Sequence, residues 1–219
     1  MKKILSSLLC LLLGIGLFAQ TDTTGVYVGV NAAKMLQMMS PQSNSNLINP
    51  YLVELGYGGS KFGFHASLGL DKSTSTHQPS SANGNVTTQV DSSHTDWRIG
   101  AYYKLAIHAR WNMHFGIDYY QSGYTQSLST EFQNEDGAQV KNDNSSIFKE
   151  SGISPYLRLD YKPHPKVSIG TELLFRIGKD NLTEKAESNL FPEFDSELIT
   201  EGNRTYFIAP SALFICLTL

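Results

Sequence analysis

The chain has 219 residues, of which 41% are hydrophobic and 17% charged, with a formal net charge of −3. This length suits one domain with a sizeable core. The slightly acidic balance, without a basic patch or a phosphate-binding loop, predicts no nucleic-acid partner.

The N-terminal segment has the parts of a secretory signal peptide. Two lysines follow Met1, an apolar run of about fifteen residues comes next, and Ala19 supplies the small residue before a cleavage site. The run is short for a membrane-spanning helix. We therefore predict a cleaved signal peptide at 1–19 and one domain at 20–219. Only Cys216 then remains, so no internal disulfide can form.

Eight later segments are predicted to be β-strands, and the first seven alternate between apolar and polar residues with the period of two that is typical of such strands. In the clearest, at 61–71, Phe62, Phe64 and Leu68 share one face and His65 lies on the other. The last segment is apolar on both faces, so its facing stays open. In chain order the segments are 25–31, 51–57, 61–71, 97–105, 111–120, 152–161, 167–177 and 206–219.

The connections between these segments alternate in length. Tight turns are predicted at 58–60, around His108 and at 163–165. Short turns at one end and long loops at the other are typical of transmembrane barrels, which have an even number of antiparallel strands. About ten tilted residues also suffice to cross a membrane's hydrocarbon core. The polar stretches predicted to form the long loops are 32–48, 72–95, 122–146 and 178–204.

We therefore predict an all-β fold, an eight-stranded antiparallel up-and-down transmembrane β-barrel with short periplasmic turns and long extracellular loops. The first loop contains Met35 and Leu36, for which we expect a short capping helix or an adaptable apolar contact. The last, from Lys179 to Thr205, mixes acidic residues with aromatic ones such as Phe191. It would form a solvated outer face, or hold a basic partner or divalent cations.

A soluble secreted barrel with an apolar interior, as in lipocalins, would alternate in the same way. Three features favour a membrane barrel instead. The polar face is rich in glycine, which makes room in a narrow lumen. It also mixes both charge signs, and Trp and Tyr residues, Tyr51 among them, lie near the ends of the apolar rows as interfacial girdles.

This facing divides the strand residues into two sets. The predicted polar and charged cluster of the lumen, with a structural role, consists of Glu54, His65, Arg98, Lys104, His114, Asp118, Arg158, Asp160, Glu172 and Arg176. The predicted lipid-facing residues are Phe62, Phe64, Leu68, Trp97, Tyr103, Trp111, Phe115, Tyr119 and Phe175.

In this architecture the chain resembles the small outer-membrane β-barrels of the OmpA/OmpX type, particularly the barrel-domain proteins of Bacteroidetes-like bacteria. The resemblance covers residues 25–219 and includes the Phe18-Ala19-Gln20 end of the signal peptide. It implies a location in the outer membrane of a Gram-negative bacterium, in contact with lipid and lipopolysaccharide.

The interior of an eight-stranded barrel is just wide enough for side chains to fill. Because an unpaired buried ion costs several kcal/mol, Glu54 and Glu172 should meet partners among the lumen arginines and Lys104. Some barrels that modify lipopolysaccharide use a His and a Ser two residues apart, a spacing that His65 and Ser67 share. Alternation places both in the lumen rather than toward lipid, so we predict no catalytic residue, and no metal site or cofactor.

The expected function is non-enzymatic: a monomeric outer-membrane barrel with a structural or surface-interaction role through its long loops, where a protein partner would bind. One alternative is an accessory component of an envelope secretion or assembly machine. The other is a lipopolysaccharide-modifying enzyme.

Overall fold

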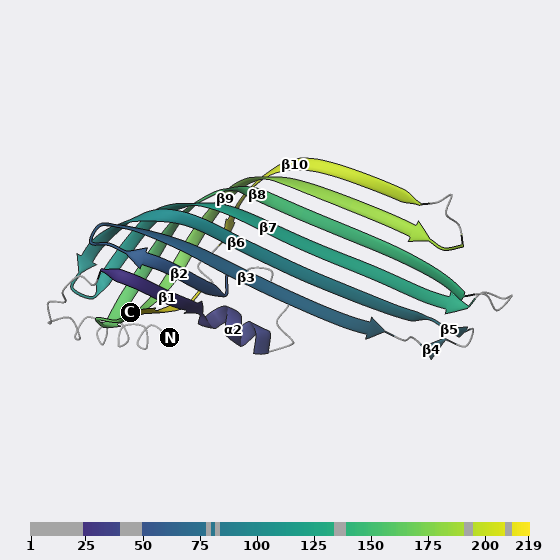
Figure 1. The fold of residues 1–219 in the computed structure, drawn as a ribbon, viewed down its shortest axis with the longest axis horizontal. Helices are drawn as coiled ribbons and strands as arrows, with labels where there is room; N and C mark the ends of the chain where they lie inside the picture. Colours follow the sequence, from purple (N-terminus) through teal and green to yellow (C-terminus); the bar gives the residue numbers. More distant parts are fainter. Residues whose placement is uncertain are drawn as a thin grey trace, which may run out of the picture.

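A computed structural model describes residues 24–39, 50–77, 80–81, 84–133, 139–190, 195–208 and 212–219. The predicted signal peptide lies outside these residues. The described chain is antiparallel β-sheet with a single helix (Figure 1). Its elements are β1 (Gly25–Asn31), α2 (Ala32–Met39), β2 (Val53–Gly58), β3 (Phe62–His77), β4 (Ser80–Ser81), β5 (Gly84–Asn85), β6 (Thr87–His108), β7 (Trp111–Gln133), β8 (Gln139–His164), β9 (Val167–Ser188), β10 (Ser196–Ile208) and β11 (Phe214–Thr218).

Hydrogen bonds join the main strands in a closed ring. Neighbours follow chain order through β1, β2, β3, β6, β7, β8 and β9, and β9 then pairs with both β10 and β11. Strand β11 also pairs with β1, from Thr218 opposite Tyr27 to Phe214 opposite Asn31. Since β10 and β11 occupy successive parts of one position beside β9, the ring has eight strands. The predicted all-β antiparallel ring of eight strands is confirmed.

The three predicted tight turns are also confirmed. Strand β2 ends at Gly58 and β3 begins at Phe62. The β6–β7 hairpin turns directly after His108, and the β8–β9 hairpin turns between His164 and Val167. All three turns therefore lie at the same end of the ring.

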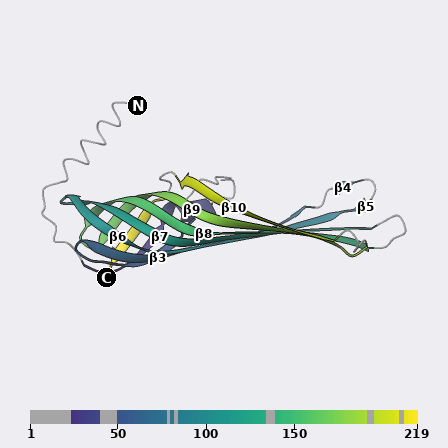
Figure 2. The ribbon, with the colours of Figure 1, turned by 90° about the horizontal axis from the view of Figure 1, so that it is seen from above.

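The ring is uneven because its strands differ greatly in length. Strands β1, β2 and β11 have 7, 6 and 5 residues, whereas β7 has 23 and β8 has 26. The long strands continue beyond the ring as a single layer, seen almost edge-on in Figure 2. We call this layer the projecting sheet; it comprises residues 71–77, 87–95, 122–133, 139–151, 178–188 and 196–204.

The prediction of long loops at 72–95, 122–146 and 178–204 is therefore largely wrong, because most of these residues are paired strand. Strand β7 pairs with β8 without interruption from Trp111 opposite Tyr161 to Gln133 opposite Gln139. Apart from Ser122, Val140 and Glu150, which are buried, the side chains on both faces of this sheet are at least partly exposed. The segments therefore lack the apolar row from which strands are recognised. Their backbone groups are nevertheless satisfied by strand pairing rather than by solvent.

The first long connection does contain a helix, as expected. The side chain of Asn31 caps α2, with its Oδ1 accepting a hydrogen bond from Lys34 N at 3.3 Å. Lys34 Nζ lies 3.3 Å from Asp71 Oδ2 on β3, and Ala32 N donates to Leu213 O beside β11. Met35 and Leu36 are exposed. Residues 40–48 of the predicted loop lie outside the described residues.

Burial settles which strand faces point into the ring. On β11, Phe214 and Cys216 are buried while Ile215 and Leu217 are exposed, which fixes the facing of the last strand. The prediction that Tyr51 belongs to an exterior girdle is wrong: the residue is fully buried. It precedes β2, which begins only at Val53, so the alternation does not extend back to it.

Glycines on the interior face give space to large side chains on neighbouring strands. A Cβ at Gly116 would overlap the ring of Tyr156, its cross-strand neighbour on β8. A Cβ at Gly123, on the same strand but in the projecting sheet, would lie 3.8 Å from Thr95 O in ordinary contact. The small residues thus make room for aromatic side chains inside the ring.

We expect Gly116→Ala to lower the free energy of unfolding by about 1–3 kcal/mol, because the buried ring of Tyr156 cannot move aside without strain. Gly123→Ala is the matched control and should change it by less than about 0.5 kcal/mol. Denaturant titration of the protein folded in detergent measures both. Equal costs would show that the two strands are less tightly packed than described.

Candidate functional site

The interior of the ring is charged. All ten residues assigned to the lumen from the sequence are buried. Of the nine assigned to the exterior, seven are exposed, and Trp97 and Trp111 are half-buried against Tyr119 and Tyr161. The ring is therefore polar inside and apolar outside, the reverse of an ordinary soluble domain.

Arg98, on β6, lies at the centre of this interior. Its guanidinium holds Glu172 through two bonds of 2.7 and 3.0 Å, and Nη2 lies 3.1 Å from Glu54 Oε2. Nη1 is 3.2 Å from Asp118 Oδ2, and the guanidinium carbon lies 4.3 Å from the ring centre of Tyr51. One arginine thus pairs with carboxylates from three other strands.

Arg158, on β8, makes a second centre nearer the short turns. Its Nη1 lies 2.6 Å from Glu54 Oε1, and its Nε donates to Asp160 Oδ1 at 2.8 Å. Glu54 therefore bridges both arginines. The ion pairs expected for Glu54 and Glu172 are present, with Arg98 and Arg158 as the partners.

His65 completes the charge balance. Its Nδ1 lies 3.2 Å from Glu54 Oε2 and its Nε2 lies 2.8 Å from Asp118 Oδ1. Since both acceptors are carboxylates, both ring nitrogens have to donate, which fits the imidazolium form. The buried residues of the described chain include six carboxylates and five lysine or arginine side chains, so a positive His65 brings the formal charges to balance.

The side chains of both His65 and Ser67 are hydrogen-bonded within this network. Ser67 Oγ donates to Glu54 Oε2 at 3.3 Å and accepts from Arg98 Nε at 3.0 Å. Both residues are less than 5% exposed and are surrounded by interior side chains. In the described chain, no cluster of three His, Cys, Asp or Glu side chains is arranged to hold a metal ion.

At the opposite end of the ring from the short turns, tyrosines share the interior with further charges. Arg176 donates to Tyr51 at 2.8 Å and to Tyr206 at 3.1 Å. Glu150 accepts from Tyr206 and from Tyr120. Sequence reasoning missed Glu150 because it lies between the loop predicted at 122–146 and the strand predicted at 152–161, although it continues the interior row two residues before Gly152.

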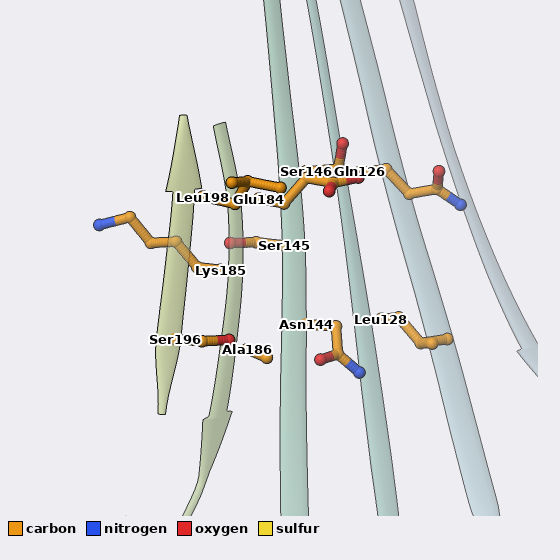
Figure 3. A pocket seen from close by; sticks show the side chains of 10 residues that line it. All are labelled: Gln126, Leu128, Asn144, Ser145, Ser146, Glu184, Lys185, Ala186, Ser196 and Leu198. Carbon is orange, nitrogen blue, oxygen red and sulfur yellow. The ribbon is translucent and has the colours of Figure 1, made fainter. Parts of the chain in front are cut away.

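The projecting sheet carries different side chains on its two faces. On the face that continues the ring interior, cross-strand pairing aligns Tyr124 with Phe148 and Phe148 with Leu182. This face also holds a shallow groove of about 490 Å³ across β7, β8, β9 and β10, lined mainly by polar side chains with Leu128, Ala186 and Leu198 (Figure 3).

The opposite face of the projecting sheet is mainly hydroxylated and charged. A second groove there, of about 580 Å³, contains Lys149, Lys179 and Glu201. Hydrogen bonds from Thr74 and Gln89 lower the pKa of the exposed Asp91 carboxyl below its ordinary value. The predicted acidic loop, Lys179 to Thr205, is thus mostly the β9–β10 hairpin of this sheet.

Comparison with protein-family models, with curated proteins and with solved structures gave no match to this chain. Within the described residues, no helix combines the length and the apolar character needed to cross a membrane. The class that fold and interior define is an antiparallel barrel-like ring of eight strands with a charged core and an apolar exterior.

Arg98→Met should lower the free energy of unfolding by about 3–5 kcal/mol, because Glu172 and Asp118 would remain buried with an uncompensated charge. Lys185→Met is the control, since the Lys185–Glu197 pair in the projecting sheet is 41% and 49% exposed. It should cost at most about 1 kcal/mol. Denaturant titration tests both, and a cost for Arg98→Met as small as that of the control would contradict the network.

Proposed function

We propose that the chain is a non-enzymatic outer-membrane protein whose ring crosses the outer membrane of a Gram-negative bacterium and whose projecting sheet is an interaction surface outside the cell. The observation that supports this proposal most strongly is the inverted ring. Charges that would be costly in lipid are paired inside, and the large apolar side chains point out.

The apolar exterior surrounds the ring. Soluble monomers rarely expose contiguous apolar patches larger than a few hundred Å². Lipid would cover such a belt, whereas a lipocalin-like soluble barrel would place these residues inside. Large apolar residues exposed on the ring strands include Val28, Leu55, Phe64, Leu68, Ile99, Phe115, Ile117, Ile153, Phe175 and Ile215.

Strand pairing suits this environment. Backbone groups inside a bilayer need partners within the protein, and a closed ring leaves no unpaired edge there. With the ring in the outer membrane, the short turns would face the periplasm and the projecting sheet would lie in the external medium, as in barrels with short periplasmic turns. The ring then needs no second copy, which fits a monomer in contact with lipid and lipopolysaccharide.

The interaction role rests on the projecting sheet, because it buries little and contributes nothing to closing the ring. It offers two grooves and two edges, one along β3 and one along β10, where only one side of the strand is paired within the described residues. Free strand edges can bind an added strand of a partner protein. The burial of His65 and Ser67 argues against an enzyme acting on lipid, whose site would open to the bilayer.

Leu68→Arg tests whether the exterior meets lipid. On the ring exterior the change should cost about 2–4 kcal/mol near the membrane midplane. Leu198→Arg is the matched control, because Leu198 is similarly exposed at 59% but lies in the projecting sheet, and its cost should stay below about 0.5 kcal/mol. Folding titrations in lipid vesicles measure the difference, and equal costs would favour a soluble barrel.

Orientation can be tested with single cysteines in whole cells. Thr200→Cys places a thiol on the exposed β10 edge, and Lys166→Cys places one in the exposed β8–β9 turn. A membrane-impermeant maleimide should label Thr200→Cys in intact cells and Lys166→Cys only after permeabilisation. The native Cys216 is buried and provides the background. Labelling of Lys166→Cys in intact cells would reverse the topology, and recovery of the protein in the soluble periplasmic fraction would exclude the membrane.

A further inference from the structure

The groove of about 580 Å³ on the outward face of the projecting sheet lies where that sheet leaves the ring. On β7, β8 and β9, Tyr119, Ile153 and Ile177 form the last exposed apolar row of the ring exterior. The next outward row, two residues further from the short turns on each strand, is polar and belongs to the groove. Across β7, β8, β9 and β10 it consists of Gln121, Ser151, Lys179 and Asn203. The groove therefore begins where the apolar exterior ends.

Two lysine side chains give this groove its positive charge. Lys149 on β8 and Lys179 on β9 are exposed, and the pairing register sets them diagonally across from each other. Neither side chain makes an ion pair with another part of the chain that the structure describes. By contrast, Lys185, further out on the same face, lies 3.3 Å from Glu197. The two ammonium groups at the base of the projecting sheet are therefore available to a ligand.

Three carboxylates border the groove, but two of them are bound on the other face of the strands. Glu150 accepts hydrogen bonds inside the ring, and Asp180 lies 2.9 Å from Arg204 Nε on the face that continues the ring interior. The third, Glu201, is exposed on the outward face of β10. The outward surface of the groove thus carries two positive charges and one negative charge among amide and hydroxyl side chains.

We infer that this groove binds the phosphate group of a membrane lipid whose acyl chains lie along Ile153 and Ile177. The inference rests on the proposed placement of the ring in the membrane. There, the end of the apolar exterior meets the headgroup layer that borders the hydrocarbon core. Ammonium groups form charge-assisted hydrogen bonds with phosphate oxygens, and the neighbouring amide and hydroxyl groups add neutral donors. A lipid gains both the charged contact and the apolar contact, whereas a soluble anion gains only the first.

Trp97 can report lipid at this groove, because it lies on β6 directly opposite Gln121. The chain has two tryptophans, so Trp111→Phe leaves Trp97 as the single reporter. This variant is reconstituted into phosphatidylcholine vesicles in which brominated phosphatidylcholine or brominated phosphatidic acid replaces part of the lipid. Brominated chains quench tryptophan fluorescence on contact. We expect both lipids to quench Trp97, with phosphatidic acid preferred about fivefold, the ratio that corresponds to one favourable charge near a membrane surface.

Substitutions in the same background connect the preference to the groove. Lys149→Gln and Lys179→Gln should each reduce the preference for phosphatidic acid to about twofold or less. Glu201→Gln removes the opposing charge and should raise it by about fivefold. Lys185→Gln is the matched control, since that lysine lies on the same face but already pairs with Glu197, and it should leave the preference unchanged.

The outcomes separate this inference from the proposed function. If brominated phosphatidylcholine does not quench Trp97, the ring exterior does not meet lipid and the membrane placement itself fails. If both lipids quench Trp97 equally, the ring lies in the bilayer but the groove does not select phosphate, which overturns the inference alone. An unchanged preference in both Lys149→Gln and Lys179→Gln, or a weaker preference in Glu201→Gln, would overturn it as well.

Discussion

The pairing of buried charge is the constraint on which this ring depends. Arg98 on β6 holds Glu54 on β2, Asp118 on β7 and Glu172 on β9. Its contacts thus cross the interior and connect β2, β7 and β9, no two of which pair with each other. A half-satisfied buried network is worse than an apolar core. Any alternative closure that separated Arg98 from these carboxylates would leave ions unpaired at a cost of several kcal/mol. The network therefore specifies one closed arrangement, whatever its net contribution to stability.

The projecting sheet follows from the ring rather than from a core of its own. It is one layer thick, so it has no second layer against which to bury a face. Its strands inherit their register from the ring, and the ladder between β6 and β7 runs from Ala106 opposite Asn112 to Thr87 opposite Glu131. Cross-strand hydroxyl contacts such as Ser73 with Ser92, at 2.7 Å, add local pairing on its surface. The closed ring thus sets the strand pairing of an exposed sheet that could not fold alone.

The sequence predicted most where one face of a strand is apolar. Alternation located seven of the eight ring positions and assigned the interior row from Glu54 to Arg176, while the eighth position was recognised only as an apolar segment and the three tight turns as the short connections between segments. It failed for the polar segments at 72–95, 122–146 and 178–204, because a strand wetted on both faces has no apolar row. Individual ion pairs could not be predicted either. Four cationic side chains were candidates for Glu172, and only strand register and side-chain geometry select Arg98.

The eighth ring position, filled by β10 and β11, shows why the sequence alone did not determine which face of this strand points inward. Five residues, 209–213, connect Ile208 to Phe214, but only three residues of β9, 171–173, separate their partners Leu174 and Gly170. The pairing register with β9 therefore shifts by two residues between β10 and β11. Because side chains alternate with a period of two, an even shift keeps the same face inward, and a shift of one would have exchanged the faces. Tyr206 before the shift and Phe214 after it accordingly both point inside. The shift lets β10 follow β9 outward as an edge of the projecting sheet while β11 pairs with the short β1 and closes the ring.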